Sequence, residues 1–337
     1  MPVTINGGDG ITNASWTTGT RPSNPAAGQM GYNTDTGSTE IYNGNDWISA
    51  QFAAVSGGSE TTITENGVDY RVHTFTSSGV LNVTSGSKSI EYLVVGGGGA
   101  SGLSFGAASG PGGAGGLIEG SGTIGVGSYP VIVGSGGAAG TNQASSDTAA
   151  ASGVPGTSGS DSEFNGIVAI GGGHGGTSNT GNSDPGTDAA DGGSGGGAAG
   201  TNTTGNSTLA GDGVSGQGNK GGEELVDGDN RVAGGGGGAG EPGDDAAPGE
   251  PGNGGDGLES SISGTAKFYA GGGGGGARDD EFSSFAGFGG KGGGGAGSVY
   301  ESPQPGAMNT GGGAGGGADR HSGAPGGSGI VIIRYPI

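Results

Sequence analysis

Short strand-like segments that run directly into blocks of consecutive glycines constrain this fold more than any other feature of the sequence. The stretch KFYAGGGGGGARDDEF, residues 267–282, places six glycines directly after a segment typical of a strand. The same junction recurs at residues 93–99 (LVVGGGG), 131–137 (VIVGSGG), 167–173 (IVAIGGG) and 231–238 (RVAGGGGG), and GGSGIVIIRY at 326–335 reverses the order. The spacing is irregular, so the pattern does not indicate a solenoid of fixed period.

Glycine runs of this kind leave few ordered conformations open to the chain. In an α-helix each glycine costs about 1 kcal/mol relative to alanine, and glycine also weakens a sheet interior. Collagen requires glycine at every third position with side chains between, and that triplet is absent here. The left-handed three-residue polyglycine II helix remains, because its outward N–H and C=O groups can bond to neighbouring rods. We therefore predict short glycine rods packed side by side, with the connecting segments at the two ends.

The composition at first favours disorder. The chain has 95 glycines and 14 prolines in 337 residues, and only 29% of its residues are hydrophobic. Such values are typical of low-complexity chains. Apolar segments nevertheless bracket each glycine block, which a disordered chain does not require, and a core of backbone hydrogen bonds needs little apolar burial. Disorder stays the alternative to the rod bundle.

The pattern along the chain predicts a mostly β and irregular fold with almost no α-helix. Turn sequences between apolar segments predict a β-meander over 30–48 that buries Tyr32, Tyr42 and Trp47. Apolar residues on both faces of 89–95 predict a strand that is covered on both sides. The expected parts are an attachment or oligomerisation β-module (1–50), a linker (51–58), a β-rich base (59–135), a polyglycine II bundle or sandwich with exposed loops (136–329) and a closing strand (330–337).

Charge and residue usage exclude several classes of function. The net charge is −21, from 31 acidic and 10 basic side chains, which disfavours nucleic-acid binding and contact with an anionic membrane. There is no cysteine, the three histidines are far apart in sequence, and no segment is apolar enough for membrane insertion. The N-terminus MPVTINGGDG predicts no signal peptide. We expect no cofactor, no metal site and no enzymatic activity.

Several segments resemble the glycine-rich domain of phage tail-fibre and related virion proteins. The resemblance covers about residues 60–337 in order and lies in segments such as YRVHTFTSSGVLNVTSGSKSIEYLVVGGGG (70–99), SEFNGIVAIGGG (162–173), NTGGGAGGG (309–317) and GGSGIVIIRY (326–335). More loosely, the chain resembles tail-fibre adhesins with a tip of polyglycine II helices and receptor-binding loops. RPSNPAAGQMGYNTDTGSTEIYNGNDWI (21–48) is similar to short attachment modules of virion proteins. The interruptions at His174 and Lys291 are expected either to lie at the surface of the bundle or to tilt their rods.

The resemblance implies a phage fibre or adhesin, made in the host cytoplasm and released by lysis as part of a virion. Its implied partners are a host surface receptor, either protein or polysaccharide, and other virion proteins that contact residues 1–50. A homotrimer is one assembly compatible with such fibres. Two alternatives stay open: a purely structural capsid, head-fibre or tail-decoration protein, and a tailspike that degrades polysaccharide.

The segment after the longest glycine run supplies the candidate receptor-binding residues. Aromatic rings beside charge on a loop suit recognition. The alternative is that some of these rings cap the end of the bundle as a small core. The candidates are Arg278, Asp279, Phe282, Phe285, Phe288 and, from a second loop, Tyr300. The acidic loops are interpreted as solvated charge, with calcium binding left open.

Overall fold

The structure, a computed structural model, consists almost entirely of strands and irregular segments, as the sequence predicts. The described part of the chain has a single helical element, the 3-10 turn η1 (Thr18–Thr20). It contains no helix with the length and apolar character that crossing a membrane would require. The structure describes residues 5–6, 10–11, 14–49, 55–104, 107–142, 153–178, 186–200, 207–227, 230–278, 285–318 and 321–337.

The chain divides into two compact units. Unit 1 contains Met1–Val55 with the short segments Val83–Lys88 and Ile124–Gly127, and unit 2 contains the remainder. Within unit 2 the strands of the base and the glycine runs alternate along the chain, whereas the sequence predicts a single boundary between them at residue 135. Residues 96–104 and 107–116 already belong to glycine runs, and the strands at 162–164 and 167–169 belong to a sheet of the base.

Unit 1 contains a four-stranded sheet in the order β3-β4-β5-β6. Strand β3 runs parallel to β4, and the other neighbours are antiparallel, so β4, β5 and β6 form the expected meander. A separate antiparallel pair, β1-β2, precedes them. The bounds are β1 (Ile5–Asn6), β2 (Gly10–Ile11), β3 (Ser15–Trp16), β4 (Met30–Asn33), β5 (Ser38–Tyr42) and β6 (Trp47–Ser49).

The core of the meander differs from the prediction. Tyr32 is not buried, because 42% of it is exposed, whereas Trp16 is 7% exposed and covers the opposite face of β4. That face is open to the indole because residue 31 is glycine: a Cβ there would lie 2.1 Å from a ring atom of Trp16. The Trp47 ring packs edge-on against Trp16 at 4.7 Å between centroids, and Tyr42 lies 5.5 Å from Trp47.

The same face of unit 1 buries a carboxylate, Glu40, which is 2% exposed. Its Oε2 accepts hydrogen bonds from Arg21 Nε at 2.9 Å and from Trp16 Nε1 at 3.1 Å, and its Oε1 accepts one from Asn33 Nδ2 at 2.9 Å. The hydrogen bonding to Arg21 outweighs the opposing effect of burial, so the pKa of Glu40 falls from 4.5 to about 2. The charged form of Glu40 is therefore part of the folded core.

Two five-stranded sheets form the base of unit 2. One has the order β12-β11-β22-β9-β8 and the other β17-β16-β13-β10-β7. The C-terminal strand β22 lies between β11 and β9 and is antiparallel to both, so the end of the chain closes the first sheet as expected. The bounds are β7 (Val55–Ser56), β8 (Ser59–Glu65), β9 (Val68–Phe75), β10 (Gly79–Val83), β11 (Lys88–Val95), β12 (Leu117–Ile124), β13 (Gly127–Ile132), β16 (Ser162–Phe164), β17 (Ile167–Ala169) and β22 (Ile330–Pro336).

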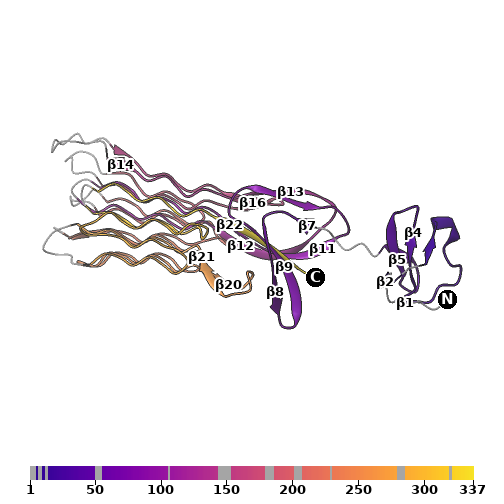
Figure 1. The fold of residues 1–337 in the computed structure, drawn as a ribbon. Coiled ribbons are helices and arrows are strands. Elements are labelled where there is room, and N and C mark those ends of the chain that lie inside the picture. The colour runs from indigo at the N-terminus through magenta and orange to yellow at the C-terminus, as the bar shows by residue number, and fades with distance from the viewer. Residues whose placement is uncertain are drawn as a thin grey trace. The chain divides into compact units, whose positions relative to one another are not determined.

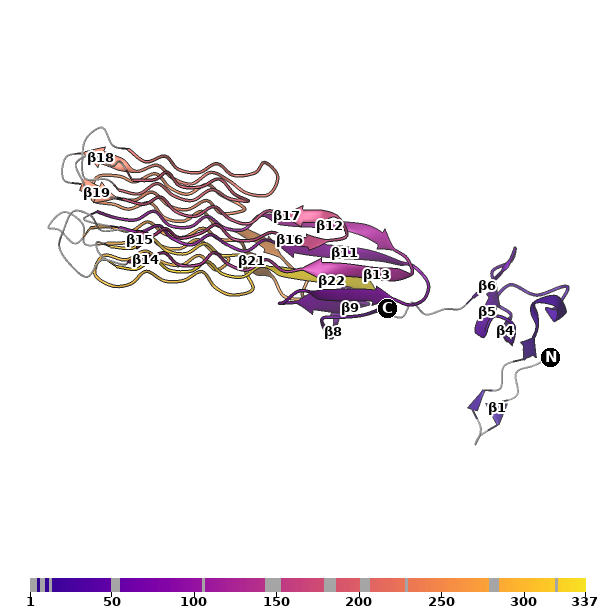
Figure 2. The ribbon, with the colours of Figure 1, turned by 90° about the horizontal axis from the view of Figure 1, so that it is seen from above.

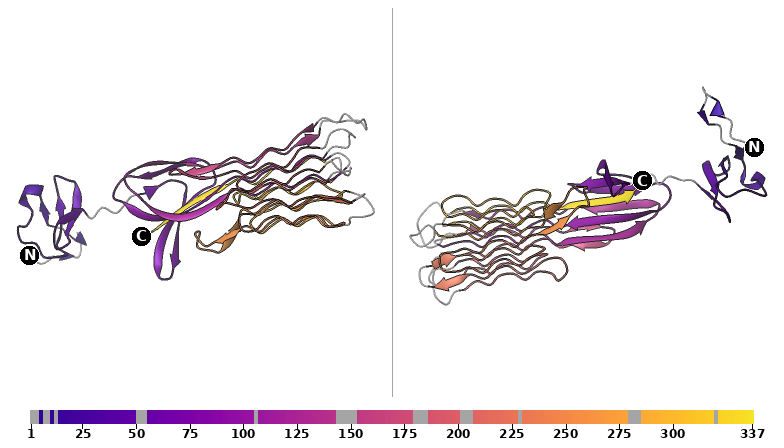
Figure 3. Two further views of the ribbon diagram at one scale, coloured as in Figure 1. Left: turned by 180° about the vertical axis from the view of Figure 1, so that it is seen from behind. Right: turned by 90° about the horizontal axis from the view of Figure 1, so that it is seen from below.

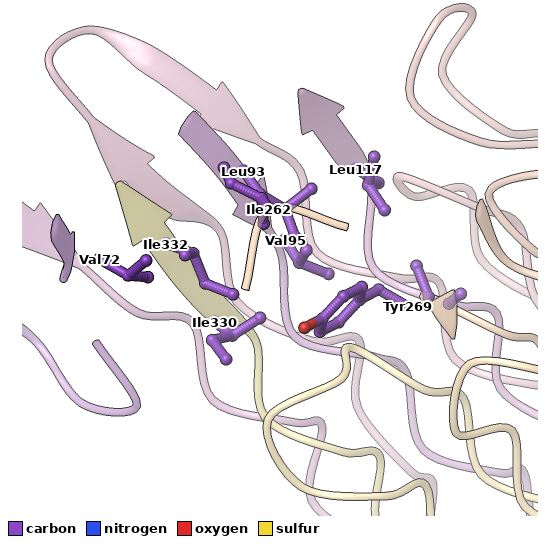
Figure 4. Close-up of a cluster of buried hydrophobic side chains, with 10 residues drawn as sticks. Val72, Leu93, Val95, Leu117, Ile262, Tyr269, Ile330 and Ile332 are labelled. Carbon is purple, nitrogen blue, oxygen red and sulfur yellow. The ribbon is translucent and has the colours of Figure 1, made fainter. Parts of the chain in front are cut away.

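The first sheet is buried on both faces near the glycine runs. Leu93, Val94 and Val95 at the end of β11 are all fully buried, which confirms the prediction for that strand. One face carries an apolar cluster that also includes Tyr269, and Figure 4 shows its side chains converging from the sheet and from the segment before a glycine run. On β16, Phe164 is fully buried and lies 6.4 Å from the Tyr92 ring of β11, which joins the two sheets.

The glycine runs lie side by side beyond the base of unit 2, as the ribbon views show (Figures 1, 2 and 3). Three short hairpins, β14-β15, β18-β19 and β20-β21, connect some of them. Their bounds are β14 (Thr141–Asn142), β15 (Gly153–Val154), β18 (Leu225–Asp227), β19 (Asn230–Val232), β20 (Leu258–Ser260) and β21 (Lys267–Tyr269). We call the following segments the glycine bundle: 96–104, 107–116, 133–140, 155–161, 170–178, 186–200, 207–224, 233–257, 270–278, 285–318 and 321–329.

Backbone hydrogen bonds within the glycine bundle repeat every three residues. In the run 96–102, donors three residues apart bond to the same neighbour: Gly96, Gly99 and Gly102 to Gly116, Gly113 and Gly110; Gly97 and Ala100 to Ser160 and Thr157; Gly98 and Ser101 to Gly327 and Ala324. The N···O distances are 2.8 to 3.1 Å. Carbonyls of the same run accept from Gly137, Gly172, Gly175 and Ala314. A three-residue period is the period of polyglycine II, and the left-handed sense of the runs stays a prediction.

The close approach of the runs explains why so many positions are glycine. A Cβ atom added at Gly97, Gly98 or Gly99 would lie 2.0 to 2.1 Å from a carbonyl oxygen of another run. Such a separation lies far inside van der Waals contact, so any side chain there would push the runs apart. The glycine bundle is thus a core held by backbone hydrogen bonds and close packing, in place of apolar side chains.

Candidate functional site

Several runs end together at the end of the glycine bundle remote from the base. Figure 2 shows β18 and β19 at this end. A small buried apolar cluster, which we call the end cluster, holds the run ends in place. The members of the end cluster come from segments that are distant in sequence. The connecting segments that follow these members in the chain therefore all begin at the end cluster. The buried members are Val232, Ala277 and Val299, against which Leu225, Ala246 and Ala286 pack.

Three of the predicted recognition residues adjoin the end cluster. Arg278 follows Ala277 and its backbone N–H donates to the Arg231 carbonyl at 3.2 Å. Phe285 precedes Ala286 and is 74% exposed, and Tyr300 follows Val299 and is 60% exposed. The fold thus supports these residues from the same cluster. Asp279 and Phe282 lie outside the described residues.

Phe288 lies on the side of the glycine bundle, not in a loop as the sequence predicts. Its backbone N–H donates to Asn253 Oδ1 at 2.9 Å, and its carbonyl accepts from the Gly254 N–H at 2.8 Å. Its position is therefore fixed within a hydrogen-bonded run. The ring itself points away from the bundle, with 75% of the residue exposed.

The run that carries Phe288 shows the three-residue period in its exposure. Phe285, Phe288 and Lys291 are exposed, while Gly287 and Gly290, which precede the last two, are buried. The side chains at 285, 288 and 291 therefore occupy the one outward position of each three-residue turn. We call these three residues the outer stripe.

Fixed polar groups flank the outer stripe. Asp256 Oδ1 accepts the backbone N–H of Lys291 at 2.8 Å, and its Oδ2 accepts from Lys291 Nζ at 2.6 Å. The hydrogen bond from the Lys291 side chain is the largest cause that lowers the pKa of Asp256, followed by the bond from its backbone. Asn253 Nδ2 donates to Asp244 Oδ2 at 3.1 Å, and Lys291 Nζ lies 5.5 Å above the Phe268 ring.

Some acidic side chains accept backbone hydrogen bonds, a role that the interpretation as solvated charge did not include. Asp188 Oδ1 accepts the backbone N–H of Leu209 at 2.8 Å, and Asp191 Oδ1 accepts that of Asp212 at 2.7 Å. An outer run has N–H groups that face away from the bundle, and these carboxylates satisfy them. The sequence signal is a three-residue spacing of Asp, Asn or Ser, as in 158–161, 188–191 and 253–256.

The other residues singled out in the sequence lie where their surroundings are structural. Lys291 is exposed and His174 is half-buried, so both lie at the bundle surface as predicted. His73 is fully buried in β9, with Nδ1 2.7 Å from the Gly57 carbonyl and its ring stacked on Tyr335 at 5.6 Å. Among the described residues, no three side chains of His, Asp or Glu come together in a way that could hold a metal ion.

Comparison with known proteins identifies a matching family. A family model described as a glycine-rich domain matches residues 73–336, from within β9 to the end of β22. The match therefore covers most of the first base sheet and the whole glycine bundle, and it leaves unit 1 outside apart from its two short segments. No curated protein matches this chain.

Proposed function

Because the chain belongs to the glycine-rich domain family, we propose that it uses the glycine bundle as a scaffold for recognition. The proposed protein is a phage virion fibre or tail-fibre adhesin that binds a host surface receptor. The observation that carries this proposal is the end cluster, which brings together run ends from distant parts of the sequence. A rigid scaffold that gathers chain connections at one end suits recognition, because the connections can change while the scaffold stays the same.

The exposed aromatic residues beside the end cluster support a binding role. Phe285 and Tyr300 are each more than half exposed although they adjoin buried residues of the cluster. Aromatic side chains presented in this way are frequent in binding surfaces. We propose that these two residues, together with Arg278, contribute to the receptor contact.

Unit 1 is the proposed attachment part. It has its own four-stranded sheet and its own buried residues around Glu40 and Trp16. A compact unit that lies outside the matched family is free to bind a different partner from that of the bundle. We propose that it binds other virion proteins, and that the assembled particle leaves the host cell by lysis.

Binding to susceptible cells tests the proposed function. The purified chain should bind these cells and should compete with phage adsorption, and Phe285→Ala should weaken binding without lowering the melting temperature. Met308→Ala is a matched control, because Met308 is also apolar and 78% exposed but lies in a turn away from the end cluster.

Cell binding, competition with adsorption and an assay for released reducing sugar together separate the alternatives. If the wild-type chain neither binds cells nor competes with adsorption, the adhesin proposal fails and a structural virion protein takes its place. If it releases reducing sugar from envelope polysaccharide, the tailspike alternative is correct.

A further inference from the structure

The outer stripe is unusual among the outward positions of the glycine bundle. Within the described residues, the outward positions of the other outer runs carry mostly small or polar side chains and no exposed aromatic ring. The corresponding exposed pairs are Ser135 and Ala138, Pro155 and Ser158, Asp188 and Asp191, Leu209 and Asp212, and Ser322 and Pro325. The run 285–291 instead places two phenylalanines on successive turns, at 74% and 75% exposure.

The spacing of the two rings follows from the period of the run. A three-residue turn of this conformation rises about 9 Å, so Phe285 and Phe288 are separated by about that distance along the side of the bundle. Two rings held apart in this way do not form a contiguous apolar patch. A protein interface has its energetic centre in a closely packed, desolvated cluster, which two separated rings do not supply.

The polar groups beside Phe288 are held in fixed positions. Asn253 is oriented by its bonds to the Phe288 N–H and to Asp244, and Asp256 is oriented by both nitrogens of Lys291. Asn253 lies beside the backbone of Phe288, and Asp256 and Lys291 lie one turn further along the run. An aromatic ring followed along the run by amide, carboxylate and ammonium groups suits an oligosaccharide, whose sugar rings have an apolar face and hydroxyl groups at their edges. Carboxylate and amide oxygens accept hydrogen bonds from hydroxyls, and amide and ammonium groups donate to them.

The charge of this face selects among sugars. Asp244 and Asp256 flank the stripe, Lys291 compensates the charge of Asp256, and the whole chain carries a net charge of −21. A uronic acid, sialic acid or phosphorylated sugar would be repelled. The chemistry therefore favours an uncharged oligosaccharide.

We propose that the outer stripe binds an extended neutral oligosaccharide along the side of the glycine bundle. One pyranose stacks on Phe288, with its hydroxyls bonded to Asn253. A neighbouring sugar in one direction reaches Asp256, and one in the other direction reaches Phe285. This inference deepens the proposed function, on which it rests, by naming the class of receptor and a contact outside the loops.

The test uses the full chain and four defined probes: maltohexaose, cellohexaose, mannohexaose and the anionic hexagalacturonate. Saturation-transfer NMR identifies binding, and calorimetric titration measures Kd. We expect at least one neutral hexaose to bind and hexagalacturonate to bind at least tenfold more weakly. Phe288→Ala should weaken binding of the neutral hexaose about tenfold, while Phe288→Trp and the control Met308→Ala should preserve it.

Three results would overturn the inference: no neutral hexaose binds, Phe288→Ala binds as well as wild type, or hexagalacturonate binds best. If Phe288→Ala loses cell binding while no hexaose binds the wild type, the stripe contacts a protein receptor and the glycan proposal is wrong. If hexaose binding depends on Phe288 but the chain does not bind cells, the oligosaccharide site stands and the adhesin function fails.

Discussion

Replacing a single glycine in the middle of the bundle by alanine should be severely destabilising. At Gly273 an added Cβ would lie 1.9 Å from the carbonyl oxygen of Ala314 and 3.0 Å from Pro111 Cβ. Ordinary van der Waals contact begins at 3.4 Å, so the two runs would have to separate by about 1.5 Å. The substitution thus tests whether backbone contact between the runs holds the bundle together.

The cost follows from the bonds at this contact. The Gly273 N–H donates to the Gly112 carbonyl at 3.1 Å, and the Gly112 N–H donates to Ala314 at 2.8 Å. A shift of about 1.5 Å lengthens at least one of them beyond a useful hydrogen bond. Overpacking costs about 1–3 kcal/mol, and each buried polar group left unpaired costs about 1–3 kcal/mol. One overpacked contact and one unpaired group together cost roughly 2–6 kcal/mol, which corresponds to a melting temperature lowered by about 4–24 °C.

Differential scanning calorimetry of the full chain measures this loss, and Gly122→Ala is the matched control. Gly122 lies in β12, and an added Cβ there meets nothing within 4 Å. The control should therefore melt within about 2 °C of wild type or slightly above it, because alanine restricts the unfolded chain. Both tryptophans, Trp16 and Trp47, belong to unit 1, so their fluorescence shows independently that this unit stays folded. If Gly273→Ala melts with wild type, the close-packed glycine core is refuted.

Three further predictions concern the acidic side chains and the backbone. Unit 1 should lose stability as the pH falls from about 4.5 towards 2, because the pKa of Glu40 is about 2 in the folded chain and near 4.5 in the unfolded chain. Tryptophan fluorescence measures the unfolding of unit 1 as a function of pH. If the Glu40→Gln variant unfolds over the same pH range as wild type, this prediction is wrong. Asp256→Ala should destabilise unit 2 by about 1 kcal/mol through the uncapped Lys291 N–H, whereas Asp256→Asn should retain most of the stability, as Asn253 does for Phe288; equal calorimetric losses would refute the capping role. A crystal structure at atomic resolution should show φ near −75° and ψ near +145° in the runs, and right-handed dihedrals would exclude polyglycine II.

The strands and the period-three packing were accessible from the sequence because each leaves a local pattern. Apolar residues on both faces of 89–95 indicated a strand covered on both sides, and the reversed junction at 326–335 indicated a closing strand; β11 and β22 bear out both. The glycine blocks indicated packing too close for side chains, and Gly97 and Gly98 lie so near other runs that neither has room for a Cβ.

Long-range choices were not accessible. The position of Trp16 on β4 depends on the missing side chain of Gly31, and nothing in the meander sequence alone excludes Tyr32 from that face. Similarly, Phe288 belongs to a run because Asn253 and Gly254, distant in sequence, bond to its N–H and to its carbonyl. Phe285 and Phe288 lie in similar sequence surroundings. Whether each of them lies at the end or on the side of the glycine bundle depends on the residue at which the hydrogen-bonded run begins, and the local sequence does not give that residue.

The three-residue period of the runs separates the positions that folding requires to be glycine from the positions that are free to change. In an inner run every position faces another run, and at many of them only glycine fits, as the added Cβ contacts at Gly98 and Gly99 show. In an outer run one position in three faces solvent, and its backbone N–H needs only an Asx or Ser side chain from the next run. Side chains at these positions that do not accept such an N–H can therefore be exchanged at little cost to the scaffold, about 9 Å apart along the bundle. The exposed rings of Phe285 and Phe288 at two such positions therefore support the binding role that we propose for them.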